Sequence, residues 1–139
     1  MDLSNKKIDD YVLKLGEKTV KPIFQGGMGV NISTKELALE VARLGGVGHI
    51  SDAMMPDVAD RLYNTRFTSL KARQCKSMAG IDPKPDMHFD PIEIERATRM
   101  YVQDVMSAKK GDGLVFINCM EKLTMNDAGE TLRHRLNAA

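Results

Sequence analysis

The stretch Val20-Lys-Pro-Ile-Phe-Gln-Gly-Gly-Met-Gly-Val30 decides how we interpret this chain. It begins as an apolar run and changes abruptly to glycine at Gly26 and Gly27, as expected where a strand brings its backbone close to a ligand. Gln25 supplies an amide that can donate and accept hydrogen bonds, and Met28 supplies a flexible, polarizable side chain that can cover an aromatic face. The simpler interpretation is a glycine-rich turn between a strand and a helix.

The composition is that of a single-domain length of chain with an aliphatic core. The 139 residues are 42% hydrophobic but only 5% aromatic, so aliphatic and methionine side chains must fill the core. A formal net charge of +1 gives no overall field that would attract nucleic acid or a membrane surface. We find no signal peptide, no run near the ~18 apolar residues of a membrane span, and no metal or redox spacing around Cys75 and Cys119. We therefore expect a cytoplasmic protein without nucleic-acid or membrane partners.

Apolar runs predict three strands, at residues 20–25, 47–51 and 114–118. A helix is expected between successive strands, which makes the strands parallel and the fold class α/β. In parallel α/β folds, ligands bind where the strands end. Those ends carry Gln25 to Met28, His49 to Asp52, and Asn118 to Met120, so amides, small residues and methionines would surround one point. This arrangement suits a flat heteroaromatic ring such as a flavin.

Several helices are expected around these strands. A short one would cover residues 4–15 and end at Gly16. A capping box at 33–36 opens a second helix, which Gly45-Gly46 ends and whose apolar positions are Leu37, Val41 and Leu44, with Ala38 and Ala42 beside them. Asp90 would cap a third helix, with Pro91 in its first turn and a buried face of Ile94, Ala97, Tyr101, Val105 and Ala108. A last helix would begin near Asn126 or Asp127, with Leu132 and Leu136 on one face.

Two other kinds of site fit the sequence less well. Gly27-Met-Gly29-Val-Asn-Ile32 matches part of a dinucleotide-binding motif, with Asp52 near the place of a ribose-binding acid, but Ile32 replaces the third glycine. Asp86-Met-His88-Phe-Asp90 alternates three potential metal ligands, but Asp90 is already expected as a helix cap. We therefore expect no metal site.

Pro22-Ile-Phe-Gln-Gly-Gly-Met28, followed by Leu37-Ala-Leu-Glu-Val-Ala-Arg-Leu-Gly-Gly-Val-Gly48, closely resembles the start of the nitronate monooxygenase family, formerly called 2-nitropropane dioxygenases. That family is a TIM barrel that binds FMN. The resemblance implies that the backbone from Gln25 to Met28, through Gly26 and Gly27, meets the isoalloxazine ring and that Asn118 bonds its polar edge. It also implies oxidation of a small alkyl nitronate with O2. Flavin-dependent enoyl-acyl-carrier-protein reductases share much the same opening and are the alternative of the same class.

A TIM barrel needs about 250 residues, so we interpret residues 1–139 as a single partial domain, the N-terminal part of such a barrel. We expect this part alone to be inactive, and we assign no catalytic role to His49, His88 or His134. Residues 53–90 are a long insertion after the second strand, either a lid over an anionic substrate or a solvated surface excursion. The alternative from a different functional class is that the chain is a non-catalytic fragment, which binds flavin weakly or only associates with itself into a homo-oligomer.

Overall fold

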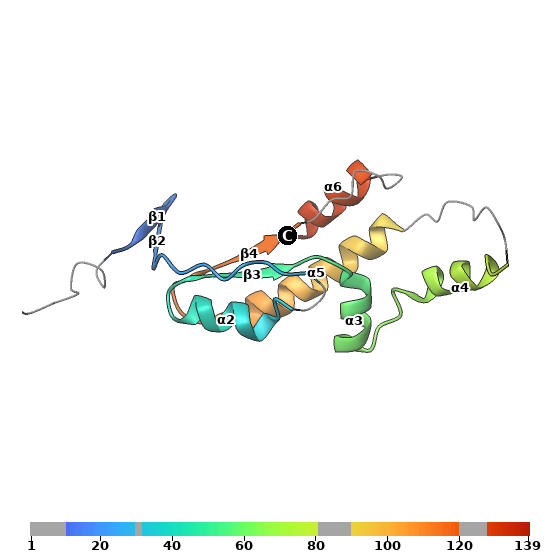
Figure 1. Cartoon of the computed structure of the whole chain (residues 1–139), viewed down its shortest axis with the longest axis horizontal. Helices are drawn as coiled ribbons and strands as arrows, with labels where there is room; N and C mark the ends of the chain where they lie inside the picture. Colours follow the sequence, from blue (N-terminus) through green and yellow to red (C-terminus); the bar gives the residue numbers. More distant parts are fainter. Residues whose placement is uncertain (1–10, 30–31, 81–89, 120–127) are drawn as a thin grey trace, which may run out of the picture.

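The computed structural model describes residues 11–29, 32–80, 90–119 and 128–139 and has a mixed α/β architecture. Its elements in chain order are β1 (Leu13–Leu15), β2 (Lys18–Val20), α2 (Lys35–Arg43), β3 (Val47–Ser51), α3 (Met55–Tyr63), α4 (Ser69–Ser77), α5 (Pro91–Ala108), β4 (Leu114–Asn118) and α6 (Ala128–Ala138). Helices α2 and α5 lie on one side of the β3–β4 pair, and α3 follows beyond the end of β3 and packs against α5 (Figure 1). The β1–β2 hairpin lies at one end of this body, and α4 projects at the other.

Strands β3 and β4 form a parallel pair at the centre, in a register that sets Val47 opposite Leu114 and Ser51 opposite Asn118. Both strands have the bounds that the apolar runs predicted. The expected strand at 20–25 is only partly formed: Phe24 makes an isolated parallel bridge to Val47. The described residues thus form two separate two-stranded sheets. They establish the α/β class, and the TIM barrel stays a prediction.

The helix expected at 4–15 is wrong over its described last part. Residues 13–15 form β1, which pairs antiparallel with β2 so that Leu13 lies opposite Val20. Residues 4–10 lie outside the described part of the chain. Gly16, expected to end a helix, instead has φ +59 in the two-residue turn of the hairpin. A tight hairpin favours glycine at such a position, because the turn requires positive φ to match the strand twist.

Helix α2 packs against the strands through alanine and glycine instead of through its leucines. The predicted helix is present, and of its apolar positions Ala38 and Ala42 are fully buried, whereas Leu37 and Leu44 are exposed. A Cβ on Gly48 of β3 would lie 2.1 Å from the Ala38 carbonyl oxygen, and one on Gly113 would lie 2.3 Å from the Ala42 carbonyl oxygen. The helix backbone therefore rests directly on the strands, which a leucine between them would prevent.

The C-terminus of α2 is as predicted. Gly45 has φ +88, its N–H donates to Ala42 O at 3.0 Å, and the N–H of Gly46 donates to Val41 O at 3.0 Å. These two bonds make a Schellman motif, which satisfies the last carbonyls of the helix and turns the chain straight into β3.

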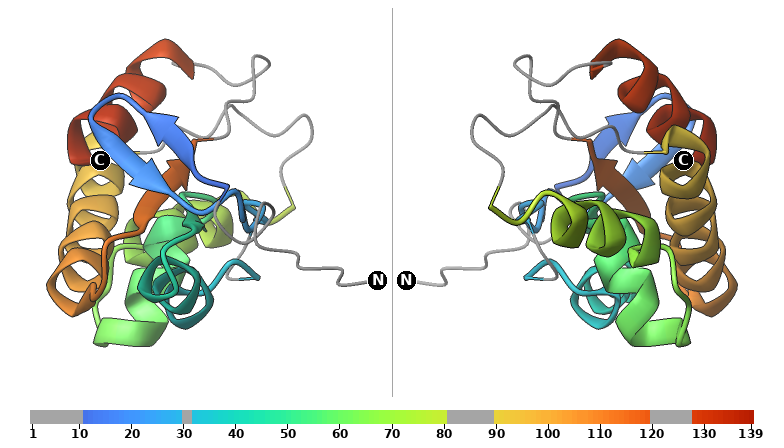
Figure 2. Two further views of the ribbon diagram at one scale, coloured as in Figure 1. Left: turned by 90° about the vertical axis from the view of Figure 1, so that its left-hand side faces the viewer. Right: turned by 90° about the vertical axis from the view of Figure 1, so that its right-hand side faces the viewer.

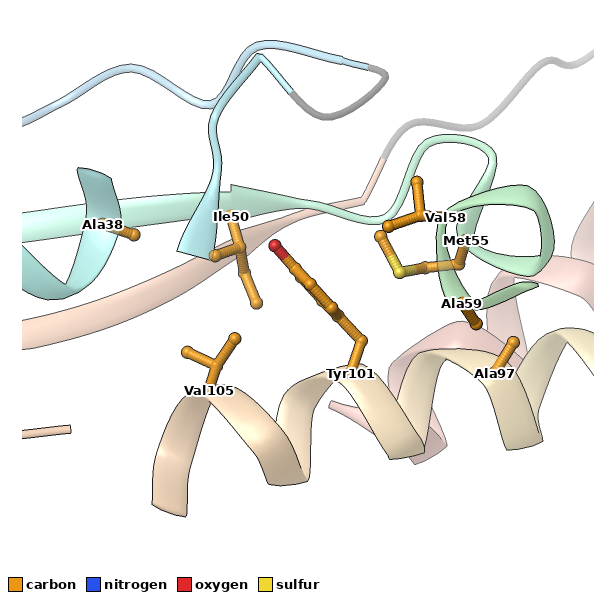
Figure 3. Packing of buried hydrophobic residues seen from close by; sticks show 8 residues of the cluster. All are labelled: Ala38, Ile50, Met55, Val58, Ala59, Ala97, Tyr101 and Val105. Carbon is orange, nitrogen blue, oxygen red and sulfur yellow. The ribbon is translucent and has the colours of Figure 1, made fainter. Parts of the chain in front are cut away.

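Helix α5 contributes one side of the hydrophobic core and packs against residues of β3 and α3. Asp90 caps it by accepting a 2.9 Å bond from Ile92 N, as predicted. Four of the five residues predicted on its inner face, Ile94, Ala97, Tyr101 and Val105, are buried, and Ala108 is half-buried. Figure 3 shows how this face meets β3 and α3, in a cluster formed by Ala38, Ile50, Met55, Val58, Ala59, Ala97, Tyr101 and Val105.

The long segment after β3 contains helices α3 and α4. The Asp60 carboxylate of α3 fixes the loop that leads to α4. It accepts hydrogen bonds from both the N–H and the hydroxyl of Thr68, at 2.9 and 2.7 Å. Burial opposes ionisation of Asp60, but hydrogen bonds from residues 65–68 together lower its pKa. The Arg96 guanidinium lies over the Phe67 ring, with its Cζ atom 5.9 Å from the ring centroid. Helix α4 is thus anchored at its start, while its body projects from the fold (Figure 1).

Helix α6 packs beside the first turns of α5 (Figure 2). It begins at Ala128, close to the predicted start, and it buries Thr131 and Ala138, whereas Leu132 is half-buried and Leu136 is exposed. His134 hydrogen-bonds Glu95 of α5, and this bond lowers the pKa of the Glu95 carboxyl. None of the helices in the described ranges is long and apolar enough to cross a membrane.

The Gly48 contact can be tested directly. Gly48→Ala should lower the free energy of unfolding by about 1–3 kcal/mol, because the new methyl group meets helix backbone that cannot rotate away. Gly129→Ala is the control, since its Cβ would meet no described atom, and we expect a change below about 0.5 kcal/mol. Urea unfolding measures both. Equal stability of the two variants would contradict the close contact.

Asp104 of α5 joins three helices. It accepts a 2.7 Å bond from Lys35 of α2 and a 2.8 Å bond from the Tyr63 hydroxyl of α3. The Lys35 bond lowers the pKa of the Asp104 carboxyl, partial burial opposes that change, and the Tyr63 bond adds to it. Burial and this carboxylate raise the pKa of Tyr63.

A depressed carboxyl pKa stabilises the fold above the unfolded value and loses that effect as the pH falls through the folded value. Asp104→Asn should therefore cost about 0.5–1 kcal/mol near neutral pH, and the difference from wild type should shrink below about pH 4. Urea unfolding at several pH values measures this difference. Glu40→Gln, in an exposed pair with Arg43, should change stability less. A difference that stays constant down to about pH 3 would show that ionisation of Asp104 does not matter.

Candidate functional site

Gln25 joins the glycine loop to β3. Its backbone N–H donates to Val47 O at 3.0 Å, and its side-chain oxygen accepts a 2.9 Å bond from the His49 backbone N–H. The Nδ1 atom of His49 bonds the Gln25 carbonyl oxygen, which can only accept, so Nδ1 carries the proton. The Gln25 amide, expected to face a ligand, is thus engaged within the fold.

Ser33 is the centre of the loop, although the sequence predicted it as a helix cap. Its buried hydroxyl accepts bonds from the Met28 N–H at 2.6 Å and the Gln25 amide at 2.9 Å, and donates to Gly26 O at 2.9 Å. Thr34 is the actual cap of α2, accepting a 3.3 Å bond from Leu37 N. Two adjacent hydroxyl residues were the pattern that could have revealed this division, because only one of them can be the cap.

Asn118 explains Gly27. Its side-chain nitrogen donates to Gly27 O at 3.1 Å, and a Cβ on Gly27 would lie only 2.7 Å from the Asn118 Cβ. Position 27 therefore needs glycine to leave room for Asn118, whether or not a ligand binds there. The structure thus brings together Gly27, which follows the bridged residue Phe24, and Asn118, which ends β4.

Gly26 and Met28 are the parts of the loop that remain open. A Cβ on Gly26 would meet no described atom within 4 Å, and its φ is not in the left-handed region, so neither packing nor backbone geometry requires glycine there. Met28 is 58% exposed. Bare backbone and a soft apolar side chain are features against which a planar ring could stack. The amides of Gln25 and Asn118 already have partners in the fold.

The strand face opposite the helices carries an aromatic row below this loop. The His49 ring lies 5.4 Å from the Phe116 ring, edge to face, and 6.5 Å from the Phe24 ring. Phe24 and Phe116 stay 47% and 42% exposed. The exposed parts of these two phenylalanines form an apolar surface.

A buried charge lies at the same ends of β3 and β4. The Asp52 carboxylate is fully buried and lies 3.6 Å from Arg135 Nε of α6. Burial, then the charge of Asp52 and a hydrogen bond with it, raise the pKa of Cys119 to about 11, so this thiol stays protonated at neutral pH and is a poor nucleophile. Sequence reasoning missed this pair, because nothing near Asp52 in the chain points to a helix over 80 residues away.

The two other sites considered from the sequence fare differently. Asp52 faces Arg135 inside the protein, so it is not placed to bind a ribose, and the dinucleotide interpretation is wrong in this respect. Of the metal candidates, Asp86 and His88 lie outside the described residues, and Asp90 is the cap of α5. Within the described ranges, no group of three metal-binding side chains comes together.

Comparison of the chain with known protein families and with curated proteins gave no match. The chemistry of the site therefore follows from its geometry: an open glycine, an exposed methionine and a loop held by Ser33, at the carboxyl end of parallel strands. Such a surface can accept a planar ring against its backbone.

Ser33→Ala tests how the loop is held. Removing the hydroxyl leaves the Met28 N–H and the Gly26 carbonyl without their partner, so we expect a loss of about 1–3 kcal/mol in unfolding free energy and faster hydrogen exchange at the Met28 amide. Ser107→Ala, which removes an exposed hydroxyl on α5, is the control and should change neither quantity. Unaltered exchange at Met28 in the Ser33 variant would refute this role.

Proposed function

We propose that this chain carries the flavin-binding glycine loop, residues 25–28, of an FMN-dependent oxidoreductase of the nitronate monooxygenase type. The observation that supports it most is the open side of Gly26, at the carboxyl end of a segment bridged in parallel to β3. Glycine at this place has no reason within the described fold, and a ring stacked on the backbone would supply one. The resemblance of residues 22–28 and 37–48 to the nitronate monooxygenase opening supports the same ligand.

In this proposal the chain's own residues bind and orient. Gly26 lets the ring approach the main chain, and Met28 covers part of its apolar surface. Ser33 holds both residues in place through the bonds already described, and Asn118 is a positioning residue that fixes Gly27.

When bound, FMN would supply the redox chemistry, taking electrons from a small nitronate and passing them to O2. A flavin-dependent enoyl-thioester reductase would use the same glycine loop, and none of the described contacts favours a reductase over a nitronate monooxygenase. The segment after β3 leaves on the side where the strands end, as expected of a lid, and α4 presents the exposed Arg73 and Lys76 with no acidic residue in its sequence. These charges favour an anionic substrate.

Self-association is the second candidate, and one observation favours it. Parallel strands are normally covered on both faces, yet Phe24 and Phe116 are exposed on the face opposite the helices. A second copy of the chain that packs against this face would bury them. In that case the chain would sediment as a dimer without FMN, and it would not require a ligand at Gly26.

Titration of FMN into the purified chain, followed by quenching of flavin fluorescence, tests the proposal. We expect saturable binding by the wild type and at least about tenfold weaker binding by Gly26→Val, because the new side chain occupies the space of the ring. Gly26 is the informative position, since substitution at Gly27 would disturb Asn118 whether or not FMN binds.

Gly129→Val is the matched control. A Cβ on Gly129 would also meet no described atom within 4 Å, and this glycine lies on α6 and not in the glycine loop. It should bind FMN as the wild type does. Absence of binding by the wild type, or equal affinity of the Gly26 variant, would rule out the proposed site.

A further inference from the structure

Met54 has a backbone conformation that its side chain does not favour. It has φ 57 and ψ 34, in the left-handed region, and it occupies the cap position of α3 without making a side-chain hydrogen bond. The other described non-glycine residue with positive φ is Asn64, a type that tolerates this region well. Glycine would satisfy the backbone at position 54 without strain.

The core does not explain a methionine at this position. Met54 is 44% exposed, whereas its neighbour Met55 is 2% exposed and packs into the cluster with Val58 and Ala59 (Figure 3). The left-handed turn itself is needed, because the chain must turn from β3 directly into α3, with the Met55 N–H returning to Asp52 O at 3.3 Å. The turn therefore requires the conformation but not the side chain.

Met54 lies beside the candidate site. A Cβ on Gly29 would lie 3.5 Å from the Ala53 Cβ, so the end of the glycine loop contacts the residue before Met54. Asp52, two residues earlier, donates its N–H to Asn118 O at 3.2 Å at the ends of β3 and β4. Two exposed methionines, Met28 and Met54, thus flank one contact between neighbouring loops.

We propose that Met54 is a ligand-binding residue that, together with Met28, holds the planar ring of the bound heteroaromatic cofactor between two soft apolar side chains. Strained backbone retained at the edge of a site is a recognised feature of ligand contacts. Thioether side chains adapt to aromatic surfaces and contact them favourably. The inference rests on the proposed function, which supplies the ligand, and it adds a residue on the second loop to the glycine loop.

Met54→Gly separates a ligand contact from a structural role. In the whole chain we expect FMN to bind at least about tenfold more weakly by flavin fluorescence, while the Tm stays the same or rises by up to about 4 °C, because the strain is relieved. Met54→Leu, which keeps the apolar bulk, should bind FMN within about threefold of the wild type. Asn64→Gly makes the matched change at the other end of α3 and should leave the affinity unchanged.

The outcomes distinguish this inference from the proposed function. If the wild type binds FMN and Gly26→Val weakens binding, but Met54→Gly binds as tightly as the wild type, Met54 is not a ligand contact and the inference alone is wrong. A fall in Tm of several degrees in Met54→Gly would also overturn it, since the side chain would then stabilise the fold itself. If the wild type does not bind FMN, the proposed function fails, and the inference fails with it.

Discussion

The backbone contact between α2 and the two parallel strands is the constraint on which the remaining structure depends. Ala38 and Ala42 on the helix face Gly48 and Gly113 on the strand side, and none of these positions has room for a larger side chain. Because the helix lies so close, the Schellman turn at its end can lead straight into β3. The same closeness brings the start of α2 back to the carboxyl ends of the strands.

The candidate site follows from that placement. Since α2 begins beside the strand ends, Ser33, just ahead of its cap, reaches the glycine loop and satisfies its backbone groups. Asn118 arrives at the same edge from β4 and takes the space that a side chain at Gly27 would need. The side of Gly26 and the methionines Met28 and Met54 are left exposed, and this is the surface where we propose that a cofactor binds.

Charged groups hold the outer helices to this frame. Asp104 connects α2, α3 and α5 through Lys35 and Tyr63 at a partly exposed position. Asp52 is fully buried and Arg135 is half-buried, so loss of Arg135 would remove a charge partner from a carboxylate inside the protein, which is more costly than loss of a surface pair. The pair connects α6 to the ends of β3 and β4. Burial and the Asp52 carboxylate, opposed by the charge of Arg135, raise the pKa of the Cys119 thiol at the same edge.

The sequence by itself determined the two central strands, the cap at Asp90, the inner face of α5 and the glycine C-cap of α2, because each depends on residues within a few positions of one another. It also placed Gln25 to Met28 and Asn118 at one edge. Only the tertiary structure decided that residues 13–15 form a strand, that alanines and not leucines of α2 face inward, and that Ser33 supports the loop. It also decided that Gly27 accommodates Asn118, 91 residues away. These features depend on partners distant in the chain, whose approach distance no local pattern records.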